Sequence, residues 1–117
     1  MTATPISLPA VLSDPAARRD LTWQAFRDGI EVSWVYRSEA ADGPATAFLR
    51  YAPGAQAPLH EHTGYEHILV LEGEQSDQHG TYGVGSLTVN APGTRHTVTS
   101  TTGCVVLAIW QSPVRFI

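Results

Sequence analysis

The sequence predicts an all-β sandwich or barrel. Short runs rich in β-branched and aromatic residues alternate with turns marked by glycine and proline, and signals for long amphipathic helices are scarce. About eight such runs follow one another at regular spacing, a pattern typical of sandwiches and barrels. They cover residues 30–37, 45–51, 58–61, 66–72, 81–82, 87–90, 96–99 and 104–111. One helical turn is expected over residues 14–19, with Ser13 or Asp14 as its cap and Pro15 in the first turn.

Composition and charge limit the classes of partner. The chain has 117 residues, of which 43% are hydrophobic and 15% charged, a balance typical of one globular domain. The formal net charge is -4 and no basic run occurs, so neither nucleic acid nor an anionic membrane is expected as a partner. Cys104 is the only cysteine, which excludes an intramolecular disulfide.

No segment reads as a signal peptide or a membrane span, so we expect a cytoplasmic protein. Residues 1–22, with three prolines, are expected to form an N-terminal arm that lies on the barrel or pairs with a neighbour. Residues 23–117 are expected to form a single domain.

Four side chains form a candidate metal site. His60 and His62 are two residues apart in an expected strand, so they point to the same face about 7 Å apart and can tilt onto one ion. Glu66 follows a turn, and its carboxylate can reach the same ion if its strand lies beside the first. His96 begins a strand after a Pro-Gly turn and can supply a fourth ligand.

This set of three imidazoles and one carboxylate suits a transition metal better than calcium or magnesium, which prefer oxygen ligands. A tetrahedral zinc ion with four protein ligands would be saturated and structural. A six-coordinate iron, manganese or nickel ion would keep two positions open for substrate or dioxygen. The sequence leaves both cases open.

The spacing of these residues resembles the two sequence motifs of the cupin superfamily. The first motif, G-x5-H-x-H-x3,4-E-x6-G, is matched throughout by Gly54, His60, His62, Glu66 and Gly73. The second, G-x5-P-x-G-x2-H-x3-N, is matched by Gly85, Gly93 and His96, with Ala91 and Ser100 in place of the usual proline and asparagine. These two departures affect the shape of a turn and not the ligands.

Within the superfamily, residues 23–110 look most like the ChrR-like cupins. The features are residues 51–54, 73–77, 79–85 and 100–104. The resemblance implies an RmlC-like jelly-roll β-barrel (a double-stranded β-helix), usually a homodimer, that binds one divalent transition metal ion such as Fe, Zn, Mn or Ni. The family contains C-terminal domains of anti-sigma factors and lies close to dioxygenases that cleave dihydroxyacetophenone or acetylacetone. The chain has no His-x3-Cys-x2-Cys pattern, so we do not expect it to bind a sigma factor as ChrR proteins do.

Two functions follow from this resemblance. The first is a metal-dependent dioxygenase-type oxidoreductase that acts on a small organic substrate, with Glu66 as a catalytic proton acceptor. The alternative is a non-catalytic sensor module that binds a metal and a small ligand. Epimerase chemistry on a sugar nucleotide is a weaker reading, because metal-free epimerase cupins generally lack the complete ligand set.

Several other residues are expected to have no part in the chemistry. His67 has the opposite parity to Glu66 and should point away from the ion, and His79 should be exposed in a turn. Cys104 is expected to be a small buried hydrophobe, and Asp77 a turn residue. Leu59, Leu69 and Leu71 either fill the space between sheets or form a dimer face.

Overall fold

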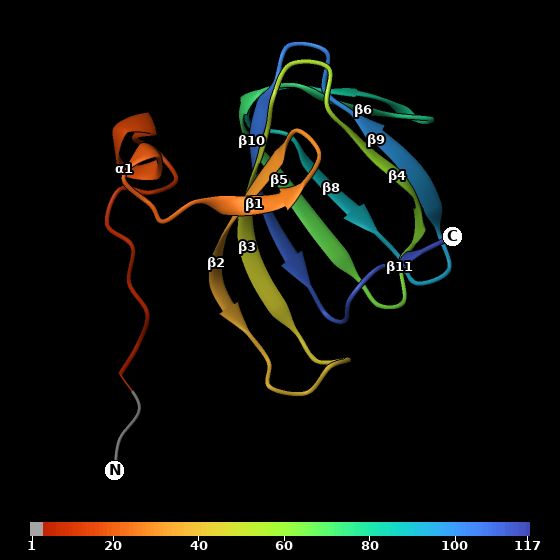
Figure 1. Ribbon diagram of the computed structural model, residues 1–117, viewed down its shortest axis with the longest axis horizontal. Coiled ribbons are helices and arrows are strands. Elements are labelled where there is room, and N and C mark those ends of the chain that lie inside the picture. The colour runs from red at the N-terminus through yellow and green to blue at the C-terminus, as the bar shows by residue number, and fades with distance from the viewer. Residues whose placement is uncertain (1–3) are drawn as a thin grey trace.

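The computed structural model describes residues 4–117 as two antiparallel sheets that face each other (Figure 1). The six-stranded sheet has the order β1 (Gln24–Arg27), β2 (Ile30–Arg37), β3 (Ala45–Tyr51), β10 (Cys104–Trp110), β5 (Glu66–Gly73) and β8 (Leu87–Asn90). The five-stranded sheet has the order β11 (Arg115–Phe116), β4 (Gln56–Glu61), β9 (Arg95–Thr99), β6 (Gln75–Asp77) and β7 (Gly80–Tyr82). Strands distant in sequence are neighbours, as β3 with β10 and β4 with β9, which is the order of a jelly roll. The predicted all-β jelly-roll barrel is thereby confirmed.

The longer strands and the short β7 lie where the sequence predicts them, whereas three other short strands were missed. The expected runs over residues 30–37, 45–51 and 87–90 coincide with β2, β3 and β8. The strands β1, β6 and β11 were not expected. Each is short, and β1 is exposed along its whole length, so it has no alternating pattern to detect.

The helix α1 (Pro15–Arg19) confirms the predicted helical turn. Its cap is Asp14, whose carboxylate accepts a hydrogen bond from the Ala16 N–H at 2.9 Å. Among residues 4–117, no helix is long and apolar enough to cross a membrane.

The chain before β1 lies at one side of the barrel, and the C-terminus lies at the other (Figure 1). The Arg18 side chain attaches this arm: it is 3% exposed, forms an ion pair with Glu72 of β5 at 2.9 Å and donates to the carbonyl of Val11. Val11 and Phe48 line the same depression on the outside of the six-stranded sheet.

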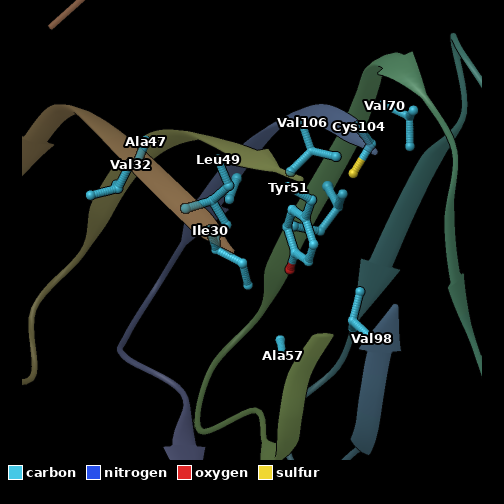
Figure 2. Packing of buried hydrophobic residues seen from close by; sticks show 12 residues of the cluster. Ile30, Val32, Ala47, Leu49, Tyr51, Ala57, Val70, Val98, Cys104 and Val106 are labelled. Carbon is cyan, nitrogen blue, oxygen red and sulfur yellow. The ribbon is translucent and has the colours of Figure 1, made fainter. Parts of the chain in front are cut away.

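The interior is filled by aliphatic side chains from both sheets (Figure 2). Val32, Leu49, Val70 and Val106 come from the six-stranded sheet, while Ala57 and Val98 come from the five-stranded sheet. Complete burial of one such valine contributes roughly 1.5–3 kcal/mol. Leu59, Leu69 and Leu71 do not fill this space, because Leu59 is 39% exposed and the other two alternate with the inward-facing residues of β5.

The strand β4 departs from strict alternation. Ala57 pairs with Val98 and His60 with His96, so three steps along β4 match two along β9. This β-bulge leaves Pro58 and Leu59 both outside, while Ala57 and His60 both face the interior. The bulge therefore places the first histidine of the candidate site opposite His96.

We expect Gly73→Ala to lower the free energy of unfolding by more than about 2 kcal/mol in a denaturant titration. Gly73 ends β5 with φ at +69°, and an added methyl group would collide with the carbonyl oxygen of Gly103. Gly54→Ala is the matched control. Gly54 also has a positive φ, +82°, but an added methyl group would meet no neighbouring atom within 4 Å. We therefore expect this variant to lose only about 1 kcal/mol, the cost of the left-handed backbone conformation for alanine. Equal losses in the two variants would contradict the steric argument.

Candidate metal centre

Three buried histidines converge inside the barrel. His60 lies in β4, His62 follows it, and His96 lies in β9; one ring nitrogen from each lies within 4.8 Å of the other two. The ring centroids are 4.6 Å apart for His60–His96 and His62–His96, and 5.3 Å apart for His60–His62. His60 is 5% exposed, His62 1% and His96 5%. The structure thus brings together three residues of the predicted set, and they could hold one metal ion.

Each of the three rings has an oxygen atom beside its Nδ1 atom. These contacts are His60 with the Pro58 carbonyl at 2.8 Å, His62 with Thr94 Oγ1 at 2.9 Å, and His96 with Asp77 Oδ2 at 3.0 Å. The Thr94 hydroxyl donates its own hydrogen to the Ala91 carbonyl, so its oxygen acts as acceptor towards His62. Since all three partners accept, each Nδ1 carries the hydrogen and each Nε2 can offer a lone pair, as in histidines that ligate metals.

One of these Nε2 atoms has no partner. Among residues 4–117, Nε2 of His96 is the single buried side-chain nitrogen or oxygen without a hydrogen bond. Leaving such an atom buried and unpaired costs about 1–3 kcal/mol. A metal ion held by the three histidines would satisfy it, so the residues present fit the ion that the resemblance implies.

Glu66 begins β5 beside this cluster. Its two neighbours across the sheet are Trp110 of β10 and Asn90 of β8. The Trp110 Nε1–H donates to Glu66 Oε2 at 2.6 Å, and the Asn90 amide donates to Oε1 at 3.0 Å. Oε1 also lies 3.1 Å from Nε2 of His62. The three-histidine cluster does not include this carboxylate, and its role as a fourth ligand stays a prediction.

Glu66 and His62 shift each other's pKa in opposite directions. Burial alone would raise the pKa of Glu66, but the hydrogen bonds from His62 and Trp110 outweigh it and lower the pKa. Burial would lower the pKa of His62, but the contact with Glu66 raises it. The pKa of His60, which has no such partner, is lowered by burial. Glu66 is therefore ionised, and His62 holds an extra proton more readily than His60.

An inner cavity of about 70 Å³ adjoins His60, His96 and Glu66. Its walls are mostly aliphatic and aromatic, and it has room for about five water-sized groups. Tyr51 and Gln75 are further polar residues on its wall. Burial raises the pKa of Tyr51, so its hydroxyl keeps its hydrogen and can donate it to a ligand.

Sequence reasoning missed the residues that hold the site together. Asp77, expected in a turn, lies in β6, and its carboxylate fixes the ring of His96. Burial would raise its pKa, but the hydrogen bonds from His96, the His79 backbone N–H and Tyr82 together outweigh burial and lower the pKa. Asn90 and Trp110 were placed in strands but not beside Glu66. These contacts depend on the pairing of strands that are distant in sequence, and no local sequence pattern predicts that pairing.

Three of the residues expected to lie outside the site do so, namely His67, His79 and Cys104. His79 is exposed, and His67 lines a depression on the outer face with Tyr36 and Tyr65. Cys104 is 4% exposed within the hydrophobic core, and burial raises the pKa of its thiol. These features confirm that none of the three contributes to the histidine cluster.

Comparison with known proteins shows the relatives of this chain. The family described as ChrR Cupin-like domain matches residues 15–114. The anti-sigma-E factor ChrR of Cereibacter sphaeroides is 34% identical over 113 residues, which cover 92% of this chain and 51% of that protein. The chain thus spans about half the length of the curated relative it matches.

Solved structures of similar fold include proteins of two kinds. The crystal structure of Rhodobacter sphaeroides SigE in complex with the anti-sigma ChrR matches with a TM-score of 0.69 and 23% identity, covering 79% of this chain and 49% of that chain. An acetylacetone dioxygenase from Acinetobacter johnsonii matches with a TM-score of 0.74 and 18% identity, covering 81% of this chain and 71% of that chain. At these identities the two matches establish a shared fold and nothing more.

We expect Asp77→Asn to weaken divalent-metal binding by about tenfold or more, because the neutral amide holds the His96 ring less firmly. Competition against a chromophoric chelator measures this affinity. Tyr82→Phe is the matched control: it removes the 3.2 Å hydrogen bond from Tyr82 to Asp77 Oδ1 but keeps the contact with His96. Equal weakening in both variants would show that the contact with His96 has no special effect.

Metal affinity is also expected to fall as the pH is lowered. A metal must replace any proton on Nε2 of His62, and the raised pKa of this ring makes the competition begin at higher pH than for an ordinary histidine. Below that pKa, affinity should fall by up to about tenfold per pH unit. Chelator competition at pH values from about 6 to 8 tests this.

Glu66→Gln serves as the control for the pH dependence. This substitution removes the negative charge that raises the pKa of His62, so the midpoint of the pH dependence should move to lower pH. An affinity that stays constant with pH in the parent protein would contradict the assignment of His62 as a ligand.

Proposed function

This chain belongs to the ChrR cupin-like domain family, and from that premise we propose that it is a metal-dependent, dioxygenase-type oxidoreductase acting on a small organic molecule. The observation that supports this most directly is the orientation of three buried imidazoles. Their Nδ1 atoms are held by acceptors, and their Nε2 atoms face a common point beside an apolar cavity. This arrangement suits one divalent ion such as iron, manganese, nickel or zinc.

His60, His62 and His96 would hold the ion, and Glu66 would complete the set. When bound, a redox-active metal would supply Lewis acidity and redox chemistry for a reaction between dioxygen and an oxygen-bearing substrate. Asp77 and Thr94 keep two of the rings in the tautomer that ligation needs.

Glu66 would also act on the substrate proton. Because its pKa is lowered, the carboxylate is ionised and can accept a proton at Oε1, the oxygen that faces His62. The hydrogen bonds from Trp110 to Oε2 and from Asn90 to Oε1 hold the carboxylate in position. A substrate whose C–H or O–H is acidified by a neighbouring carbonyl suits this arrangement.

The inner cavity would position the substrate and exclude water. Ile30, Leu49 and Ile68 contribute apolar wall, while the Tyr51 hydroxyl is a donor suited to a substrate oxygen. A site of this size accepts only a small reactive group. The dioxygenase of similar fold adds support at the level of fold alone.

The second candidate is a sensor module that binds a metal and a small ligand without turnover. It is favoured by the 34% identity to an anti-sigma factor, a regulatory protein. In this case the same residues would hold a tetrahedral zinc ion with no exchangeable water. Sigma-factor binding through a His-x3-Cys-x2-Cys segment is not part of this proposal.

We further propose that the protein acts in the cytoplasm as a homodimer, with a small molecule and neither nucleic acid nor membrane as its partner. The net charge of -4 supports the exclusion of nucleic acid. Apolar side chains on the outer face of the six-stranded sheet support pairing: Leu87 is 64% exposed, Val89 50% and Ile109 41%.

Iron-loaded protein is expected to consume dioxygen in the presence of a β-diketone or a hydroxyacetophenone, followed with an oxygen electrode. Glu66→Gln should lower the rate by about 100-fold or more, because the proton acceptor is lost. His62→Ala should abolish uptake, whereas His79→Ala, at an exposed histidine, should leave it unchanged. No uptake across the panel with iron bound would disprove the enzyme and favour the sensor module.

A further inference from the structure

A second hollow opens next to the inner cavity. This outer groove has a volume of about 620 Å³ and lies between β1, β2, the chain that connects β2 to β3, and the C-terminal segment. Four residues line both hollows: Phe26, Trp110, Val114 and Phe116. The two hollows therefore adjoin at these four side chains, with the histidines beside the inner one and solvent beside the outer one.

We propose that the outer groove binds the ring of a flat aromatic molecule whose oxygen-bearing end reaches the inner cavity. This inference rests on the proposed function, because it names the substrate class of the same site. Size supports it first: the inner cavity of about 70 Å³ holds only a small group, so a larger ligand must extend into the groove. The groove itself lies within the volume range of small-molecule sites.

The wall of the groove is aromatic. Phe26 packs edge-on against Trp34 with ring centroids 6.0 Å apart, and Trp34 packs against Trp110 at 6.0 Å with an interplanar angle of 50°. Phe116 adds a fourth ring, close to His60 at 5.4 Å between centroids. Rings in such mixed orientations offer both edges and faces to a bound ring, which gains more from them than from aliphatic walls.

Two cations lie on the rings of the groove. Arg37 lies over Trp34, with the guanidinium carbon 4.3 Å from the ring centroid, and Arg27 lies over Phe116 at 3.5 Å. Glu39 is the carboxylate that lines the same groove. This surplus of positive charge suits the electron-rich face of an aromatic ring, and stacking and shape supply the selection.

Trp110 connects the groove to the chemistry. Its ring lines both hollows, and its Nε1–H donates to Glu66 Oε2 at 2.6 Å. A ligand ring in the groove would therefore contact the same indole that orients the carboxylate. In this arrangement Trp110 is a positioning residue, and the groove ties recognition of the ring to the placement of Glu66.

Two probes that differ by one ring test the proposal. Acetylacetone carries the diketone without a ring, whereas benzoylacetone carries the same diketone plus a phenyl ring for the groove. Calorimetric titration of the zinc-loaded protein gives both affinities without turnover. We expect benzoylacetone to bind about tenfold more tightly, as ring stacking and burial predict.

Variants of the groove should remove this preference selectively. Trp34→Ala and Phe26→Ala are expected to cancel most of the tenfold gain. Trp34 lines the groove and not the inner cavity, so Trp34→Ala should also leave acetylacetone affinity within about twofold of the parent. Phe26 lines both hollows, so Phe26→Ala should weaken benzoylacetone more than acetylacetone. Phe26 is 41% exposed, so its truncation keeps the variant folded if Trp34→Ala does not fold. Tyr36→Ala is the control. Tyr36 lies in β2, as Trp34 does, and is 43% exposed, but it lines a different depression.

The outcomes separate the groove from the metal site. Equal affinity for the two probes, no binding of benzoylacetone, or equal loss for both probes in Phe26→Ala would overturn the proposal. His62→Ala distinguishes the failure of the proposed function: if this variant keeps the preference for benzoylacetone and its dependence on Phe26, the groove is supported while capture by the metal is disproved.

Discussion

The site depends on three hydrogen bonds that fix the orientation of buried imidazoles. Pro58, Thr94 and Asp77 each present an oxygen to the Nδ1 atom of one histidine, and these acceptors come from separate parts of the barrel. An imidazole held in this way directs Nε2 away from that oxygen and towards the other rings of the cluster. Nε2 of His62 lies beside Glu66 Oε1 at 3.1 Å, whereas Nε2 of His96 is buried without a partner. The barrel therefore keeps a buried ring nitrogen that a bound ligand would satisfy.

The carboxylate beside the cluster belongs to a row of residues across the six-stranded sheet. Trp110, Glu66 and Asn90 lie on three adjacent strands, and each outer residue donates to Glu66. The row also joins two environments, because Glu66 borders the inner cavity while the Trp110 indole forms part of the outer groove. This row of three residues can thus connect a ligand bound in the outer groove to the charge of Glu66 at the inner cavity.

The sequence predicts the fold and the histidine cluster well because both depend on local patterns. β5 alternates regularly, β2 and β3 are long runs of β-forming residues, and the motif spacing of His60, His62 and His96 needs only a barrel to bring them together. Contacts set by strand pairing could not be predicted. Asp77 reaches His96 only because β6 packs beside β9, and three-residue strands carry no periodic signal. The same reason explains the missed β1 and β11.

The bulge in β4 makes the length of this strand as important as its composition. One additional residue between Ala57 and His60, relative to the facing strand, determines which way the histidine points. Losing it would restore regular alternation and turn either the core alanine or the histidine towards solvent. Substitutions at Pro58 or Leu59 change an outer surface, whereas an insertion or deletion there would dismantle the interior. The identity of the residues in this short stretch can therefore change, but their number cannot.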